Sequence, residues 1–155
     1  MWSFRPYIFL AISSVVWLLI ACRDSRQQAA EAMLQQANTH FEQGRYDRAL
    51  IVIDSLRKVY PGAIETRKQA LRLQQDIELK RSQEQLAVVD SALQVVIHDY
   101  EHLRQKVEKD KQELRATPEE LTMLTRTRMR RDSLQTLFEA LCGKIRYIHK
   151  KQKEM

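Results

Sequence analysis

Glycine, proline and cysteine are scarce in this sequence, and each shortage limits the fold. The 155 residues include three glycines, three prolines and two cysteines. The chain has no Asn-Gly pair and no sustained alternation of apolar and polar residues, so it lacks the usual signals of β-hairpins. Good helix formers, mainly Gln, Glu, Arg, Lys, Leu and Ala, fill the intervals between the few helix breakers. The sequence therefore predicts an all-α fold.

Two cysteines leave no room for a disulfide framework. Cys22 ends an apolar run, and Cys142 lies close to Leu141 and Ile145. If Cys22 carries lipid, Cys142 has no partner within the chain, and the fold must depend on packing. We expect Cys142 to be buried as a small apolar residue.

No apolar run is long enough to cross a bilayer comfortably. The longest, residues 7–21, covers about 15 residues or roughly 22 Å as a helix, short of the ~20 residues that a span needs. It follows a short start with one charged side chain, Arg5, and ends at the small residue Ala21. These features are typical of a secretory signal. Residues 1–21 are therefore predicted to be a signal peptide.

The end of this run, Leu19-Ile20-Ala21-Cys22, resembles the lipobox of bacterial lipoproteins. The resemblance implies that the Cys22 thiol is diacylated, that the signal is removed just before it, and that the new amine is acylated too. Two or three acyl chains anchor stably, because each buried CH₂ contributes about 0.8 kcal/mol. The alternative is an uncleaved N-terminal anchor with a chance cysteine, and in either case the chain is tethered to a membrane.

The resemblance also implies a location at the bacterial cell envelope, with the protein facing the periplasm. Arg23 and Asp24 do not form a convincing sorting signal, so the inner and the outer membrane both remain open. Among the charged side chains, removal of residues 1–21 takes away only Arg5. The remaining chain has 25 basic and 20 acidic side chains, an excess of five positive charges. Such an excess suits an anionic lipid or an acidic partner.

The few breakers predict where helices begin and end. We expect one helix over residues 25–43 with Gly44 as a left-handed cap, and a second over residues 46–60 that ends at Pro61-Gly62. Residues 63–116 contain neither glycine nor proline. They predict one helix of about 54 residues, roughly 80 Å long, which has to pack along a partner.

A last helix is predicted from Pro118 to about Lys150. Thr117 is a good N-cap, proline fits the first helical position, and Glu120 completes a capping box. Gly143 lies inside this helix, where a bend or a close contact is possible.

Residues 30–61 combine small residues, a turn glycine and a closing proline at spacings that resemble those of a tetratricopeptide repeat. The positions are Ala37, Gly44, Tyr46, Ala49, Leu50, Ile53 and Pro61. The stretch from Gly44 to Leu50 resembles the turn and second-helix opening of that family, in which small residues let two helices approach closely. Helical spacing predicts one buried face on the second helix, made by Ala49, Leu50, Ile53, Leu56 and Val59. Residues 64–79 are a candidate for the first helix of a second unit, with Ala70 and Leu71 packed against the hairpin before it. A generic helical hairpin is the alternative.

Apolar residues spaced by three and four predict a coiled-coil arm over residues 81–155. In the long helix they are Leu86, Val89, Leu93, Val96, Tyr100, Leu103, Val107 and Leu114, with Asp110 as a polar exception. In the last helix they are Leu121, Leu124, Leu134, Leu137, Phe138, Leu141, Ile145 and Ile148, with Arg128 as the exception. The short connection favours an antiparallel hairpin. We expect Asp110 and Arg128 to approach each other and fix the register, or else to be two unrelated solvated charges.

Nothing in the sequence predicts catalysis or a cofactor. His98 and His102 are four apart, but Asp99 follows the first histidine where zinc proteases have Glu, and both histidines are expected to face solvent. The basic cluster Arg126, Arg128, Arg130 and Arg131 has no interleaved aromatic residues. We expect it to pair with Glu108, Asp110 and Glu113 across the hairpin rather than to bind nucleic acid. An anionic lipid or a partner protein is the alternative.

The sequence thus predicts four segments and a non-enzymatic protein. They are a signal peptide (1–21), a lipidated N-terminus and linker (22–29), a tetratricopeptide-like hairpin with the following helix (30–80) and a coiled-coil arm (81–155). The expected function is that of a helical scaffold or adaptor, with lipid bound through acylated Cys22 and a protein partner at the envelope. A self-associating structural protein is the alternative.

Overall fold

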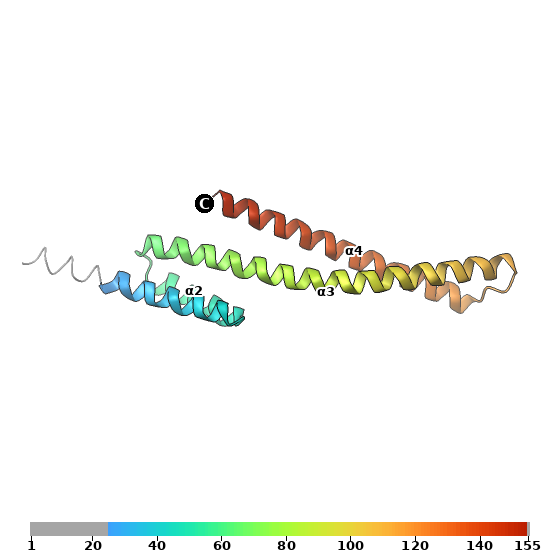
Figure 1. The fold of residues 1–155 in the computed structure, drawn as a ribbon, viewed down its shortest axis with the longest axis horizontal. Helices are drawn as coiled ribbons and strands as arrows, with labels where there is room; N and C mark the ends of the chain where they lie inside the picture. Colours follow the sequence, from blue (N-terminus) through green and yellow to red (C-terminus); the bar gives the residue numbers. More distant parts are fainter. Residues whose placement is uncertain (1–24, 155) are drawn as a thin grey trace, which may run out of the picture. The chain divides into compact units, whose positions relative to one another are not determined.

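The computed structural model describes residues 25–154, and every regular element within that range is a helix. Residues 25–42 form the first helix, and α2 (Tyr46–Val59), α3 (Ile64–Gln112) and α4 (Pro118–Lys153) follow in order (Figure 1). The predicted all-α fold is confirmed. The predicted signal peptide and Cys22 lie outside the described residues.

The described chain divides into two compact units between Ile77 and Glu78. The first unit contains the first helix, α2 and the start of α3, and the second contains the rest of α3 and α4. The sequence-based boundary lay between residues 80 and 81. Because α3 runs unbroken through both positions, no linker separates the two units.

A glycine turn ends the first helix. Gly44 has a φ of +70°, a left-handed conformation that disfavours residues with a Cβ. The Gly44 amide donates to the carbonyl of Phe41 at 2.9 Å, and the Arg45 amide donates to that of His40 at 2.8 Å. These bonds satisfy carbonyls that the helix end would leave unpaired. The predicted left-handed cap at Gly44 is confirmed.

Three alanines lie at the centre of the first unit, one from each of its helices. Ala37, Ala49 and Ala70 are fully buried, and side chains this small let helices approach closely. Larger apolar residues complete the same core: Leu34, Ile53, Leu56, Leu73 and Ile77. The small residues at positions 37 and 49, on which the tetratricopeptide resemblance depends, therefore pack as predicted.

Two predicted core positions of the first unit were wrong. Val59 is 54% exposed, because it is the last residue of α2 and lies beyond the turn that packs. Leu71 is also exposed, because it lies about 100° around α3 from the buried Ala70. Leu73, three positions after Ala70, occupies the packed face instead.

The second unit is an antiparallel hairpin of α3 and α4. Three contacts lie at increasing distance from its turn: an ion pair between Lys106 and Glu120, a stacking contact of Arg131 on Tyr100, and a hydrogen bond from Lys144 to Glu78. The position in α3 falls as the position in α4 rises, which is the signature of antiparallel helices. The predicted hairpin is therefore present within this unit.

The seam that α3 contributes follows the predicted heptad. Val89, Leu93, Val96 and Val107 are buried, and the remaining predicted positions from Leu86 to Asp110 are half-buried. Leu114 is the exception. It has a φ of +54° and is almost fully exposed, because α3 ends at Gln112 and the chain turns there.

The seam that α4 contributes differs from the prediction near the turn. Its sheltered positions are Leu124, Thr127, Arg131, Leu134, Phe138, Leu141, Ile145 and Ile148. These positions alternate by three and four, so Arg128 falls outside the seam by one residue. Leu121 and Leu137 are exposed for the same reason.

The turn between α3 and α4 is fixed by the predicted capping box. The Glu120 amide donates to Thr117 Oγ1 at 3.2 Å, and the Thr117 amide donates to Glu120 Oε2 at 3.0 Å. Hydrogen bonds from the Lys106 ammonium and the Thr117 amide hold the pKa of the Glu120 carboxyl below its usual range. One carboxylate thus caps α4 and links it to α3.

The expected burial of Cys142 in α4 was not met. Cys142 is half-buried rather than buried. Gly143 lies within an unbroken α4, and a Cβ built there would meet no atom within 4 Å, so close packing does not require glycine. Among the described helices, none is both long and apolar enough to cross a membrane.

Candidate functional site

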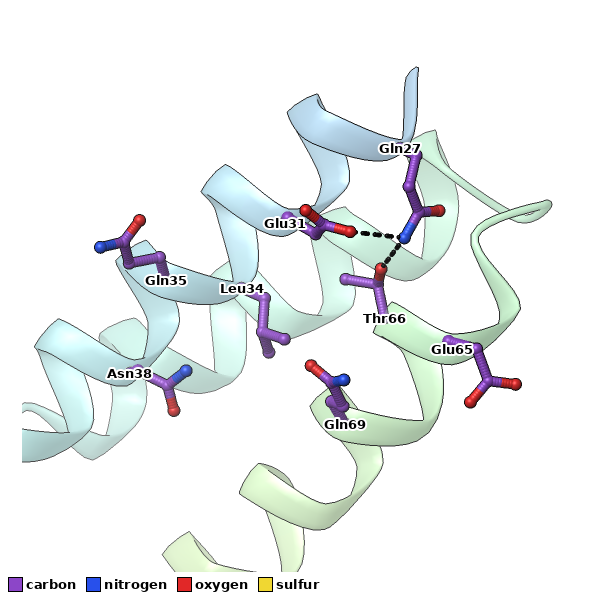
Figure 2. A pocket seen from close by; sticks show the side chains of 8 residues that line it. All are labelled: Gln27, Glu31, Leu34, Gln35, Asn38, Glu65, Thr66 and Gln69. Atoms are coloured by element: carbon purple, nitrogen blue, oxygen red, sulfur yellow. Dashed lines mark hydrogen bonds between the residues drawn. The ribbon is translucent and has the colours of Figure 1, made fainter. Parts of the chain in front are cut away.

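A polar groove runs between the first helix and the start of α3, inside the first unit (Figure 2). Its volume is about 350 Å³. The lining residues are Gln27, Glu31, Leu34, Gln35 and Asn38 from the first helix, and Glu65, Thr66 and Gln69 from α3. All except Leu34 are polar, and four carry carboxamides. The groove is therefore a surface for hydrogen bonding.

Helical spacing brings these side chains together. In the first helix the groove residues follow one another mainly at intervals of three or four, which aligns them along one face. On α3, Thr66 and Gln69 are three apart for the same reason. Leu34, Thr66 and Gln69 project into the space between the two helices, whereas Gln35 and Glu65 point away from it (Figure 2).

One glutamine joins the two walls of the groove. Gln27 Nε2 donates to Glu31 Oε1 at 2.8 Å and to Thr66 Oγ1 at 2.9 Å. Thr66 is almost fully buried, so its hydroxyl needs a partner that the groove supplies. The contact links residues 39 positions apart in the sequence and holds the start of the first helix against α3.

This groove was missed from sequence because only apolar spacing was followed in the first helix. Gln27, Glu31, Gln35 and Asn38 repeat at intervals of four, four and three. That pattern indicates a polar face, but it does not say what the face meets. The facing residues of α3 could be identified only from the fold.

The two histidines of the arm lie where sequence reasoning put them, on exposed positions of α3. His98 Nδ1 is 3.9 Å from Asp99 Oδ1. Both histidines line a shallow cavity of about 490 Å³ together with Arg130 of α4. Over residues 25–154, no group of three or more His, Cys, Asp or Glu side chains is arranged to hold a metal ion.

The predicted pairing of Asp110 with Arg128 was wrong. Asp110 Oδ2 lies 3.2 Å from Lys106 Nζ, and its other oxygen lies 3.7 Å from Arg115. Arg128 Nε is 3.8 Å from Asp132 Oδ2 on its own helix. Each of the two charges therefore has a partner close to it in the sequence, on its own helix or in the adjoining turn. Arg128 lies outside the seam.

The arginine cluster does not pair across the hairpin with the predicted carboxylates. Arg131 instead stacks on Tyr100, with its guanidinium carbon 4.3 Å from the ring centroid, and its guanidinium donates to Asp132 Oδ1. The Asp132 carboxylate, with a smaller contribution from Tyr100, raises the pKa of Arg131. Glu113 pairs with Arg115 within the turn. The seam thus contains one cation held by an aromatic ring.

Comparison with known proteins adds no relative to this description. No protein-family model matches the chain, and neither a curated protein nor a solved structure was found to be similar to it.

Proposed function

We propose that the protein is a lipoprotein of the bacterial cell envelope, anchored through acylated Cys22, and acts as a non-enzymatic helical adaptor. The observation that carries the adaptor function is the amide-lined groove of the first unit. The stretch that resembles a lipobox precedes this unit directly, with residues 22 and 25 only three positions apart. A binding surface would in this way be held close to a membrane.

The groove matches the chemistry of an extended peptide. Each residue of a peptide main chain offers one N–H donor and one C=O acceptor. A carboxamide side chain offers an acceptor for the N–H and a donor for the C=O, and Asn38 and Gln69 supply one carboxamide from each wall. A volume of about 350 Å³ is at the lower end of the range for ligand sites. A short segment of a partner protein is a suitable occupant.

The composition of the groove favours binding over catalysis. Its eight lining residues include two carboxylates and one hydroxyl, but no histidine, cysteine or lysine. A nucleophile activated by a neighbouring base is therefore not assembled among them. The exposed carboxylate of Glu31 favours a partner segment with a basic side chain beside its polar backbone.

Site-specific crosslinking in cells tests the adaptor function. A photoreactive amino acid at Gln69, inside the groove, is expected to capture a discrete protein, and the same amino acid at Lys68, outside its lining, is expected to capture little. The double variant Asn38→Ala with Gln69→Ala should abolish capture from a second groove position, Glu31. The exposed control Gln36→Ala should leave it intact. Equal capture from positions 68 and 69 would argue against the groove as the binding site.

Mass spectrometry of the protein from membranes tests the anchor separately. The expected N-terminal peptide begins at Cys22 and carries the added mass of two or three acyl chains. An intact terminus at Met1 without acyl mass would refute the anchor.

Self-association of the arm is a second candidate function. Val88 and Val95 lie one heptad apart on α3, and both are largely exposed. A second copy of the chain could cover such a stripe. Light scattering over a range of concentrations distinguishes the two functions: a dimer that the double variant Val88→Ser with Val95→Ser dissociates would favour self-association, and a concentration-independent monomer would exclude it.

A further inference from the structure

The loop between α2 and α3 lies beside the start of the first helix, at one end of the first unit. A cavity of about 880 Å³ is lined by Arg26 and Gln27 on one side and by residues 58–65 on the other. Val59 is 54% exposed and Ile64 is 63% exposed, so two large aliphatic side chains flank the loop in contact with solvent. We call Arg26, Lys58, Val59, Tyr60 and Ile64 the loop patch.

We propose that the loop patch is a membrane contact that lies on the anionic surface of the lipid bilayer. This inference rests on the proposed lipid anchor at Cys22. Ser25 is three positions after Cys22, and three residues of extended chain reach at most about 11 Å. The loop patch lies beside Arg26 and Gln27, where the described chain starts, so an anchor within that reach would hold it against the headgroups.

The charge around the loop complements an anionic surface. Five cations, Arg26, Arg57, Lys58, Arg67 and Lys68, lie on the loop and on the residues that flank it, and two carboxylates, Asp54 and Glu65, accompany them. Lys58 Nζ is 2.6 Å from Asp54, and Lys68 Nζ is 2.9 Å from Glu65. The remaining excess of three positive charges would lie about one Debye length or less from the lipid phosphates, where attraction is still effective.

The apolar members of the patch favour a bilayer over an acidic protein. Val59 and Ile64 can enter the region between headgroups and acyl chains, and the Tyr60 ring, amphipathic in character, suits the same depth. The loop keeps its shape without a ligand: Arg67 Nη1 donates to the Pro61 carbonyl at 2.8 Å, and the Ala63 amide donates to that of Tyr60 at 3.2 Å. The contact is therefore preformed, and little ordering is needed on binding.

Depth-dependent fluorescence quenching tests the proposal on the full lipidated protein. With Cys142→Ala as background, a single environment-sensitive label is attached at Gly62→Cys, in the loop, or at Gln43→Cys, in the glycine turn at the other end of α2. A Cβ at Gly62 meets no atom within 4 Å, and α2 separates the two positions by about 20 Å. The protein is reconstituted in vesicles of neutral phosphatidylcholine, or of phosphatidylcholine with phosphatidylglycerol.

In the anionic vesicles, the label at position 62 is expected to shift to the blue and to be quenched by acyl-chain nitroxides several times more strongly than the label at position 43. The double variant Val59→Ser with Ile64→Ser should lose most of that quenching, and neutral vesicles should weaken it. Quenching no stronger at position 62 than at position 43 would overturn the proposal.

Two further outcomes separate this inference from the proposed function. If Cys22 carries acyl mass and the protein floats with the vesicles while position 62 remains in water, the membrane contact is wrong and the anchor stands. If no acyl mass is present, the anchor and the membrane contact are both wrong. Shielding of position 62 by soluble polyglutamate but not by anionic vesicles would assign the loop patch to an acidic protein and would also overturn the proposal.

Discussion

The packed face of α2 can be tested by comparing two isoleucines of the same helix. Ile53 is 1% exposed in the core of the first unit, and Ile51, two positions earlier, is 59% exposed. Two residues of an α-helix are about 200° apart around its axis. The same substitution to alanine at each position therefore has the same effect on helix propensity but a different effect on packing.

The expected cost at Ile53 follows from the atoms removed. Ile53→Ala removes three buried carbons, worth about 0.8 kcal/mol each in transfer free energy. The surrounding Ala37, Leu56 and Ala70 belong to helices that can relax only in part, so a cavity term is added. The free energy of unfolding should fall by about 3 kcal/mol, within the 2–5 kcal/mol found for such truncations. Ile51→Ala should change it by less than about 0.5 kcal/mol.

Urea unfolding followed by circular dichroism at the helix band measures both variants. The midpoint should fall for Ile53→Ala with an unchanged slope, which indicates a loss of stability rather than a change in the surface exposed. In a thermal scan the same loss should lower the midpoint by about 10 °C. Equal losses for the two variants, or a larger loss for Ile51→Ala, would refute the assignment of the packed face and with it the alanine-centred core.

Three other predictions follow from the arm. Gly143→Ala should stabilise α4 by about 0.5–1 kcal/mol, because glycine lowers helix stability and a Cβ there meets no atom; thermal melting checks this gain. Arg131→Ala should lower the free energy of unfolding by about 1–2 kcal/mol through lost stacking and packing, whereas Arg128→Ala should lower it by less than about 0.5 kcal/mol. Chemical denaturation measures both variants, and a larger loss for Arg128→Ala would show that the seam is assigned wrongly. Lys106→Ala should raise the pKa of Glu120 in a carboxyl NMR titration. Since the folded pKa is lowered, the stability that Glu120 contributes is present above its unfolded pKa of about 4.3 and is lost as the pH falls through the folded value.

In the arm, heptad spacing predicted the packed face of α3 correctly and that of α4 only in part. In α3 the apolar residues recur without a gap from Leu86 to Val107, and the predicted seam is the observed one. In α4 there is a gap of ten positions between Leu124 and Leu134 with no apolar residue in the seam. Counting back from Leu134 by three and four leads to Arg131 and Thr127, so the error at Arg128 was one of phase. Spacing could not show that Arg131 stacks on an aromatic ring, because its partner Tyr100 lies on another helix.

The sequence by itself determined the helical class and the places where helices stop. Gly44, Pro61 and Thr117 act through their own backbone geometry or through partners three residues away, so their effect is already present in the local sequence. Only the tertiary structure decided which faces meet: the contact of Gln27 with Thr66 spans 39 positions. Helical periodicity assigns residues to a face, but the neighbour of that face depends on the packing of all the helices in the unit together. The groove and the loop patch, both made by segments distant in sequence, are products of that packing.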